Sequence, residues 1–367
     1  MHAVYCHDFG ESTVETADRP ETGAGEVLLE VHRVQLSVTE CALYRGSEIA
    51  HYESIRDRLD EGPARLFGHE FCATVVDRGT GITDLDIGDR VYAPGKIPCR
   101  ECHYCESGYE LYCPSKTYIG YDIPGALAEY VSLPAAALGT VPDVLSDREV
   151  AALQPLASSV LCVSRSPLRA GDVVAVFGTG VMGYQCAQLA LAHGAARVLA
   201  VDVDERKLEL AGERGLEPID ATTTDPVEAV RDATDGVGAD VVFEAVGGDQ
   251  SNATTGTDPI AQAMAAVRTG GSVVQVGYII GDVQLSARAL RSKSITWHHP
   301  VTGVASIGPG RDTGQLAAEL VASGRVSIEE YVTHELSGLE EFETAVEITA
   351  NKDEFDARGP AQLVLRE

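Results

Sequence analysis

The chain has 367 residues, of which 44% are hydrophobic, so it is long enough to form two domains with sizeable cores. Its 56 acidic residues outnumber its 28 basic residues and give a net charge of -28, which disfavours nucleic acid and anionic membranes as partners. No apolar run approaches the roughly 18 residues of a membrane span, and the start "MHAVYCHDFG" lacks the regions of a targeting signal, so we expect a cytoplasmic protein.

The acidic residues are spread along the whole chain, and lysine occurs only at positions 96, 116, 207, 293 and 352. Such a surface is typical of proteins adapted to high salt, where counterions screen the repulsion between like charges. We therefore expect a halophilic protein from a haloarchaeal source. An ordinary acidic protein from a milder environment is the alternative.

The first 150 residues contain short strand patterns separated by many glycine and proline turns. Within them, "CRECHYCESGYELYC" places Cys99, Cys102, Cys105 and Cys113 in a C-x2-C-x2-C-x7-C pattern. Four thiolates complete the tetrahedral coordination of Zn²⁺ and leave no position for a substrate, which is typical of a structural site. The polar residues between the cysteines could not form a core, so the metal would hold this loop together. Unligated thiols on a loop are the alternative.

From Asp172 the sequence "DVVAVFGTGVMGYQCAQLALAHGAARVLAVDVD" reads as a strand, a glycine turn, a helix and a second strand. Gly178, Gly180 and Gly183 form G-x-G-x-x-G, in which glycines allow a tight turn and close approach of the backbone to a pyrophosphate. We expect this motif, with Val181 and Met182 inside it, to bind a dinucleotide. A parallel α/β domain without a nucleotide is the alternative.

The second strand of this unit ends at Asp202, 19 residues after Gly183. A carboxylate there accepts hydrogen bonds from the adenosine ribose and repels a 2′-phosphate, so the sequence favours NAD over NADP. Further apolar strands in "ADVVFEAVG" and "GGSVVQVGYI" are separated by the helical pattern "DPIAQAMAAVRTGG". This alternation predicts a doubly wound parallel sheet over about 157–296.

Further short motifs are "FGHEF" at 67–71, "GALAEYVSLP" at 125–134 and "LQPLA" at 153–157. Together with the cysteine cluster and the glycine turn, they give a chain that resembles the zinc-containing medium-chain alcohol and polyol dehydrogenases over nearly its full length. The resemblance implies an α/β fold: a GroES-like β-rich catalytic domain at 1–156 and 297–367, with the zinc lobe at about 95–115, and a Rossmann NAD-binding domain at 157–296. It also adds Lys207 as a ribose contact.

In that family a catalytic zinc is held by the cysteine of C-x-[ST]-D-x-H, by the histidine of G-H-E and by a glutamate. Aligned on the following Gly46, this chain has Ser37 in place of the cysteine, with Thr39 at the hydroxyl position. The family aspartate becomes Glu40 and its relay histidine becomes Ala42.

His69 and Glu70 are retained from G-H-E, while Gln154 stands where the family more often has glutamate. The resemblance therefore implies His69, Glu70 and Gln154 as ligands of a catalytic zinc, with Ser37 or a water completing the site. Neutral donors should weaken the binding of the metal. Cys41, one helical turn after Ser37, is a candidate replacement ligand.

Several of these residues have structural alternatives. Ser37 and Glu40 fit the S-x-x-E pattern of a helix capping box, which does not exclude ligation. His69 could be a satisfied core or turn residue. Thr39 could pass a proton outward or be a buried hydroxyl with a backbone partner.

We expect an NAD-dependent, zinc-assisted enzyme that interconverts a secondary alcohol, such as a polyol or sugar, and its carbonyl by hydride transfer. A zinc-independent quinone or enoyl reductase of the same superfamily is an alternative, favoured by Ser37 and Ala42. A non-catalytic NAD-sensing protein is a further one. The expected partners are a small-molecule alcohol or carbonyl substrate and further copies of the chain in a homodimer or homotetramer.

Overall fold

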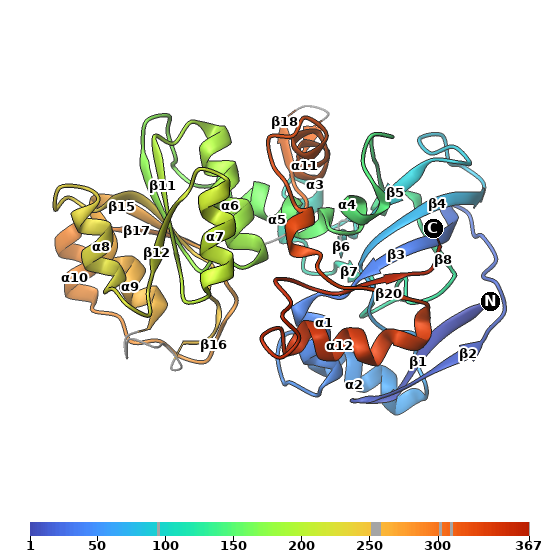
Figure 1. The fold of residues 1–367 in the computed structure, drawn as a ribbon. Helices are drawn as coiled ribbons and strands as arrows, with labels where there is room; N and C mark the ends of the chain where they lie inside the picture. Colours follow the sequence, from blue (N-terminus) through green and yellow to red (C-terminus); the bar gives the residue numbers. More distant parts are fainter. Residues whose placement is uncertain (94–95, 251–257, 301–302, 309–310, 367) are drawn as a thin grey trace. The chain divides into compact units, whose positions relative to one another are not determined.

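The computed structural model describes residues 1–93, 96–250, 258–300, 303–308 and 311–366. The chain divides into two compact units (Figure 1). The first, here called the β-rich unit, contains 1–157, 303–322 and 328–367, and the second, the parallel-sheet unit, contains 158–302 and 323–327. None of the helices in the described ranges combines the length and apolarity required to cross a membrane.

The β-rich unit contains short strands from both ends of the chain. They are β1 (His2–Asp8), β2 (Glu11–Thr16), β3 (Glu26–Gln35), β4 (Glu70–Arg78), β5 (Arg90–Tyr92), β6 (Lys96–Ile97), β7 (Thr117–Tyr118), β8 (Tyr130–Pro134), β9 (Gly139–Thr140), β18 (Ser306–Gly308), β19 (Arg311–Asp312), β20 (Glu335–Ser337) and β21 (Gln362–Val364). The main sheet has the order β20-β21-β3-β4-β5-β9, and β8 also pairs with β3. The last residues of the chain therefore complete a sheet that begins near its start.

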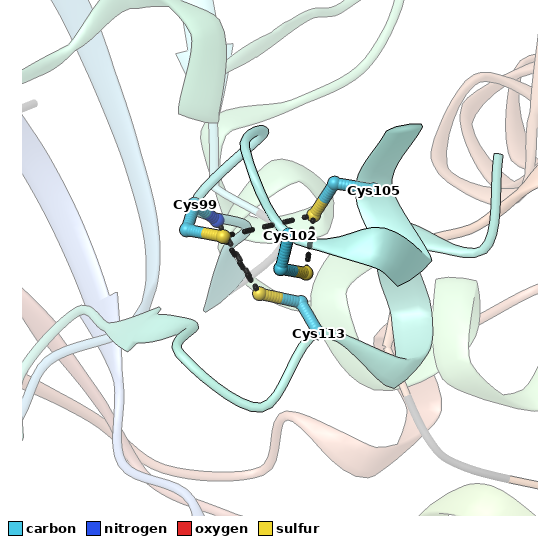
Figure 2. A group of neighbouring side chains, drawn as sticks. All are labelled: Cys99, Cys102, Cys105 and Cys113. Carbon is cyan, nitrogen blue, oxygen red and sulfur yellow. Dashed lines mark hydrogen bonds between the residues drawn. The ribbon is translucent and has the colours of Figure 1, made fainter. Parts of the chain in front are cut away.

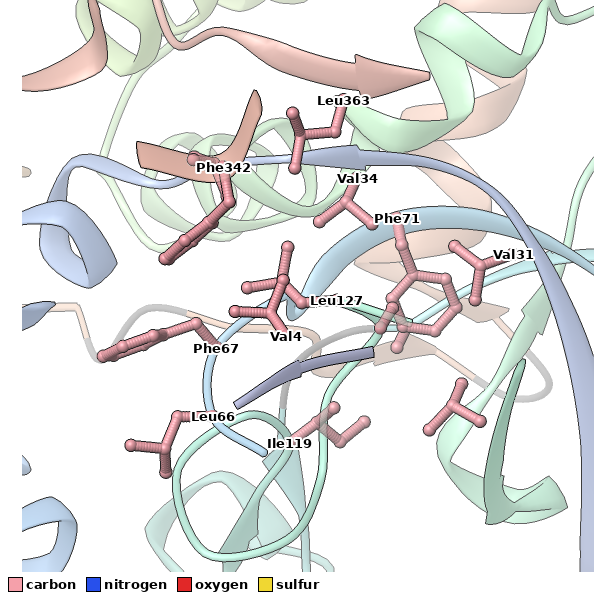
Figure 3. Close-up of a cluster of buried hydrophobic side chains, with 14 of the residues drawn as sticks. Val4, Val31, Val34, Leu66, Phe67, Phe71, Ile119, Leu127, Phe342 and Leu363 are labelled. Atoms are coloured by element: carbon pink, nitrogen blue, oxygen red, sulfur yellow. The ribbon is translucent and has the colours of Figure 1, made fainter. Parts of the chain in front are cut away.

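This unit also contains several helices. They are α1 (Val38–Tyr44), α2 (Tyr52–Glu61), α3 (His103–Glu106), α4 (Asp147–Ala151), α11 (Thr313–Ala322) and α12 (Phe342–Ala350), while α5 (Leu153–Ser164) continues into the other unit. Apolar side chains from the strands and from α12 meet in one buried cluster (Figure 3), because alternate strand residues point to the same face. Members of this cluster include Val4, Val34, Phe71, Leu127, Phe342 and Leu363.

The register of this sheet places polar residues side by side at one end of β3. Gln35, the last residue of β3, pairs with Glu70 at the start of β4 and with Gln362 at the start of β21. All of them are buried. Because His69 directly precedes β4, this register also sets the position of the histidine.

The parallel-sheet unit alternates strands and helices. Its strands are β10 (Val173–Phe177), β11 (Arg197–Asp202), β12 (Glu217–Asp220), β13 (Ala239–Glu244), β14 (Gly248–Asp249), β15 (Val267–Gln275), β16 (Ile279–Ile280) and β17 (Thr296–His298). Its helices are α6 (Val181–His193), α7 (Glu205–Glu213), α8 (Pro226–Asp232), α9 (Pro259–Ala266) and α10 (Ala287–Lys293). The main sheet has the order β12-β11-β10-β13-β15-β17, so the direction of winding reverses between β10 and β13. That is the doubly wound Rossmann order.

Two details of this unit differ from the sequence expectation. The helical pattern expected through Gly271 ends at Ala266, and β15 begins at Val267, which takes an extended backbone and pairs with Ala239 of β13. The sheet also continues past 296 to His298, since β17 pairs with β15 and Trp297 packs against the core of this unit.

Candidate active site

The cysteine cluster is gathered in a small lobe of the β-rich unit (Figure 2). Cys102 precedes α3, Cys105 lies in it, and the antiparallel pair of β6 and β7 closes the base of the lobe. Sulfur atoms lie 3.5 Å apart for Cys102 and Cys105, 3.5 Å for Cys99 and Cys113, and 4.0 Å for Cys99 and Cys105. Thiolates about 2.3 Å from one tetrahedral zinc are about 3.8 Å apart. The four residues therefore fit a structural zinc ion.

A second group surrounds His69. The imidazole Nδ1 lies 2.7 Å from Oε1 of Glu40, and the backbone N–H of His69 donates to the same oxygen at 3.2 Å. Because a carboxylate only accepts, Nδ1 carries the hydrogen, and Nε2 is directed to the other side of the ring. There it lies 3.8 Å from Oε1 of Glu70. A histidine oriented by a carboxylate in this way is typical of metal ligands.

Glu70 is held from behind by the sheet. Its Oε2 accepts a hydrogen bond from Nε2 of Gln35 at 2.6 Å, and Oε1 of Gln35 accepts one from Gln362 at 3.2 Å. Burial raises the pKa of Glu70, and the nearby His69 opposes this only in part. Burial would lower the pKa of His69, but the Glu40 and Glu70 carboxylates outweigh it and raise that pKa. Binding of a cation would therefore require these groups to release protons, because metal ligands must be deprotonated.

Ser37 has a structural role in this arrangement. It caps α1: its Oγ accepts from the Glu40 N–H at 3.1 Å, while Oε2 of Glu40 accepts from the Ser37 N–H at 3.3 Å. The predicted capping box is confirmed. The Tyr121 hydroxyl also lies near the Ser37 side chain. Ser37 is thus engaged by the protein and is not preset as a metal ligand.

The remaining predicted residues differ in their exposure to solvent. Thr39 is exposed on α1, so its alternative interpretation as a buried hydroxyl is wrong. Gln154 is partly buried in the first turn of α5. The Cys41 thiol is buried near Thr349 of α12, and it joins no three-ligand group with His69 among the described residues. The Cys41 side chain thus faces α12.

The donors at His69 fit a cation only in part. Nε2 of His69 and Oε1 of Glu70 are separated as two ligands of one ion could be, and Glu40 orients the imidazole. In the described ranges, three or more cysteine, histidine or carboxylate ligand atoms come together in two places, and neither includes His69. Any catalytic ion would thus depend on amide, hydroxyl or water ligands for its remaining positions.

One of those two places is the cysteine lobe, and the other combines His32, Cys72 and Asp147. Asp147 accepts hydrogen bonds from Nδ1 of His32 at 2.7 Å, from the Cys72 thiol at 3.3 Å and from Nη1 of Arg90 at 2.6 Å. Arg90 also donates to the carbonyl of Leu145 at 2.6 Å. The guanidinium already supplies the positive charge, so this group is a structural ion-pair network.

The glycine turn of the parallel-sheet unit connects β10 to α6. Gly178 has a φ of 85°, and a Cβ there would lie 2.8 Å from the Val246 nitrogen. A Cβ at Gly183 would lie 1.8 Å from the Gly178 carbonyl oxygen. Gly180 caps α6, and Val181 and Met182 form its partly buried first turn. The turn thus requires glycine and directs helical N–H groups outward, as a pyrophosphate site does.

Asp202, at the end of β11, connects this turn to the second strand. Its Oδ2 accepts from the backbone N–H of Thr179 at 2.6 Å and from the Thr179 hydroxyl at 2.9 Å. Lys207 follows in α7, with its Nζ 4.0 Å from Oδ1 of Asp202. Both residues therefore lie at the carboxyl end of the sheet, where the reversal of winding creates a nucleotide crevice.

Exposed apolar side chains follow three strands at this same edge. Val203 is 52% exposed, Val246 is 50% exposed and Tyr278 is 62% exposed, and they come after β11, β13 and β15. Apolar side chains at this edge suit the rings of a dinucleotide. Sequence analysis missed these residues because an isolated apolar residue after a strand has no distinctive local pattern. Tyr121 and Gln35 were missed because no local motif marks them as partners of Ser37 and Glu70.

A Rossmann sheet with this glycine turn, joined to a β-rich unit with a four-cysteine lobe, defines a nucleotide-dependent oxidoreductase of two domains. Residues 23–143 match the family model described as "Alcohol dehydrogenase GroES-like domain", and residues 180–323 match "Zinc-binding dehydrogenase".

The relatives agree with these models. Probable D-xylulose reductase A of Neosartorya fischeri is 32% identical over 310 residues, which are 82% of this chain and 81% of that protein. The structure of an alcohol dehydrogenase from Thermus sp. ATN1 is 29% identical over all of both chains, with a TM-score of 0.83. A zinc-binding dehydrogenase from Sinorhizobium meliloti 1021, solved with NADP, is 26% identical over 99% of both chains, with a TM-score of 0.84.

The chain belongs to the zinc-containing medium-chain alcohol dehydrogenase family. It is an oxidoreductase that acts on CH–OH groups. The predicted combination of a GroES-like domain with a Rossmann domain is confirmed.

Proposed function

We propose that this enzyme oxidises a secondary alcohol, a polyol or a related hydroxy compound with NAD⁺, and that a zinc ion bound at His69 assists the reaction. The observation that carries this proposal is the Glu40–His69–Glu70 arrangement. Glu40 fixes Nδ1 of His69 at 2.7 Å and leaves Nε2 beside a second carboxylate oxygen at 3.8 Å. In a family of zinc-binding dehydrogenases, such an oriented imidazole is the natural first ligand.

His69 and Glu70 would hold the ion, and Gln154 would supply an amide oxygen. When bound, zinc acts as a Lewis acid and lowers the pKa of a coordinated hydroxyl. Glu40 keeps the imidazole in one tautomer, and Gln35 keeps the Glu70 carboxylate in place. Ser37 would shape the site through its cap on α1, and Thr39, which is exposed, would pass a proton to water.

The cofactor residues would be Gly178, Gly180, Val181, Met182 and Gly183, together with Asp202 and Lys207. In the reaction, the carbon that bears the hydroxyl loses a hydride to the nicotinamide of NAD⁺. The hydroxyl loses its proton to solvent, so that the products are a carbonyl compound, NADH and H⁺. NAD over NADP is part of the proposal, because Asp202 is a buried carboxylate at the ribose end of the site.

A second candidate, the zinc-independent reduction of a conjugated carbonyl compound, is favoured by one observation. The Ser37 hydroxyl is engaged in the capping box and does not replace the thiolate that the family uses. In this case the Cys99–Cys113 lobe would hold the one zinc ion of each chain. The ligand-like orientation of His69 would then have no catalytic purpose.

The test is a substrate screen of the purified protein with NAD⁺, NADP⁺, NADH and NADPH. Secondary alcohols, polyols and aldoses are compared with quinones and enones, with zinc content measured on the same samples. We expect alcohol or polyol oxidation with NAD⁺ and up to two zinc ions per chain. Turnover of enones alone, with one zinc ion per chain, would favour the second candidate.

We further propose that the protein comes from a halophilic, haloarchaeal source, acts in the cytoplasm and assembles as a dimer or tetramer. The net charge of -28 and the scarcity of lysine support adaptation to high salt. Activity that rises with KCl concentration, together with light scattering at the same salt, tests these points.

A further inference from the structure

Two acidic and two basic side chains gather where β11 ends and α7 begins. They are Asp202, Asp204, Arg206 and Lys207, all within the parallel-sheet unit. This is the end of the sheet where the adenosine ribose of a dinucleotide lies, and where a basic residue would bind the additional 2′-phosphate of NADP. The partners of these side chains therefore bear on the choice of cofactor.

Asp202 uses its oxygens within the protein. Oδ2 accepts two hydrogen bonds from Thr179, at 2.6 and 2.9 Å. Oδ1 accepts from the N–H groups of Val203 at 2.8 Å and of Asp204 at 3.0 Å. A carboxylate has about four acceptor positions, so these bonds account for all of them. Asp202 thus joins the glycine turn to the second strand, and a ribose hydroxyl would have to share one of its oxygens.

Asp204 is the partner of both cations. Its Oδ2 lies 2.9 Å from Nη2 of Arg206 and 3.6 Å from Nζ of Lys207. Its Oδ1 accepts from Nε of Arg206 at 3.1 Å and from the Arg206 backbone N–H at 3.0 Å, which caps α7. The guanidinium is thus bound through two of its nitrogens to one carboxylate, the geometry that it would otherwise offer to a phosphate.

The charge state of Asp204 supports this pairing. Burial would raise the pKa of its carboxyl group, but Arg206 and Lys207 outweigh burial and lower that pKa. The two acidic side chains of this group are matched by its two basic side chains. A doubly charged 2′-phosphate then finds no net positive charge.

We propose that Asp204 determines the choice of cofactor by pairing with Arg206 and Lys207, which keeps both cations from the 2′-phosphate of NADP. This inference rests on the proposed use of a nicotinamide dinucleotide. It separates the roles of the two aspartates: Asp202 builds the turn, and Asp204 neutralises a latent 2′-phosphate site. From the sequence, we expected Asp202 alone to favour NAD over NADP.

The test uses Asp204→Asn, since asparagine caps a helix as well as aspartate does but carries no charge. Binding of NADH, NADPH and 2′,5′-ADP is measured by titration calorimetry at fixed salt. We expect the affinity for NADPH and 2′,5′-ADP to rise about tenfold, as one charge-assisted hydrogen bond would give, while NADH stays within about twofold. The gain should shrink as KCl is raised.

A matched control is Asp225→Asn. Asp225 caps α8 in the same unit by accepting from the N–H groups of Val227 and Glu228, and it forms no ion pair within the described residues. Asp225→Asn should leave the affinities for NADH, NADPH and 2′,5′-ADP unchanged. The double variant Asp204→Asn with Arg206→Gln should return the affinity for 2′,5′-ADP to that of the wild type. Asp204→Ser, another helix-capping residue, repeats the test if the asparagine variant does not fold.

The outcomes separate this inference from the proposed function. An Asp204 variant that binds NADH normally but gains no affinity for 2′,5′-ADP overturns the role of Asp204 and leaves the dehydrogenase intact. A wild type that already binds NADPH more tightly than NADH overturns it as well. If the wild type binds neither dinucleotide, the proposed function itself is wrong.

Discussion

The cysteine lobe and the His69 site are both suited to a cation, but they are built in opposite ways. In the lobe, four identical thiols come from fifteen consecutive positions, and the loop between them has no core of its own. At His69, the two adjacent donors His69 and Glu70 are already held by other elements, through Glu40 of α1 and Gln35 of β3. The first site depends on its metal for structure, whereas the second is structured without one.

The two sites differ in whether the metal ion or the surrounding protein holds the ligands in place. A complete set of charged ligands binds zinc tightly and closes the site to substrate. A site with few charged ligands binds zinc less tightly, but the hydrogen bonds behind it keep the ligands in place. We therefore expect removal of the metal to unfold one region and to inactivate the other.

The largest effect should come from Cys113→Ser. Cys113 is fully buried in the lobe, and its loss should release the structural zinc and reduce the free energy of unfolding by several kcal/mol, given that zinc supplies about 10–16 kcal/mol in zinc-finger peptides. Zinc content and thermal unfolding measure this. The control Cys162→Ser, in the core on α5, should cost about 1–3 kcal/mol and keep the zinc. Equal zinc content in both variants would mean that the lobe does not hold the ion.

The next effect should come from Glu40→Gln. Glutamine preserves the shape and the capping box, but Nδ1 of His69 loses its charged partner, which should reduce zinc affinity or alcohol oxidation about 10–100-fold. A competing chelator and initial rates measure it. Glu149→Gln, at the same position of the capping box of α4, is the matched control and should leave both unchanged. Identical behaviour of the two variants would assign Glu40 to capping alone.

The stability that the Asp147 network contributes should depend on pH and not on zinc. Its atoms are spaced like metal ligands, but Arg90 already pairs with Asp147. His32 and Arg90 lower the pKa of Asp147 from its ordinary value of 3.8, against the effect of burial. Asp147 therefore contributes its full stabilisation above pH 3.8, and this stabilisation is lost as the pH falls further.

Asp147→Asn should lower the free energy of unfolding by about 2 kcal/mol at neutral pH, and its difference from the wild type should shrink below about pH 4. Urea unfolding at several pH values measures this, with exposed Asp143→Asn as the control. A loss of zinc in Asp147→Asn would instead make this network a metal site.

The smallest change in stability should come from Ser37→Cys, which restores the thiol that the family uses. Losing the cap should cost about 1 kcal/mol, whereas an additional anionic sulfur ligand should tighten zinc binding at His69. Ser146→Cys, in the equivalent cap of α4, should carry the same cost without any change in zinc affinity. If Ser37→Cys binds zinc no better, the side chain at 37 does not face the ion.

Much of the fold could be predicted because its signals are local. The strand, glycine turn, helix and second strand follow one another within 172–202, and each has its own residue pattern. The short strand at Gln362–Val364 could be expected, but its pairing with β3 could not, because the partners are more than 300 residues apart. The end of α9 was also missed, since two glycines after it decide between helix and strand.

The site was predicted only where a motif marked it. His69 and Glu70 came from G-H-E, and the cap at Ser37 came from S-x-x-E. The bond between Glu40 and His69 joins residues 29 positions apart, and the contact of Tyr121 with Ser37 spans 84. These contacts join residues that are far apart in the chain, which no local sequence pattern encodes.

The central claim, that a loosely held catalytic ion and a tightly held structural ion coexist in one chain, is tested most directly by removing zinc with chelators of increasing strength. Zinc content, alcohol oxidation and melting temperature are followed on the same samples. We predict two steps: the first ion leaves with loss of oxidation and little change in melting temperature, and the second leaves with a large fall in melting temperature. Full oxidation by protein that retains only the cysteine-bound ion would contradict this account.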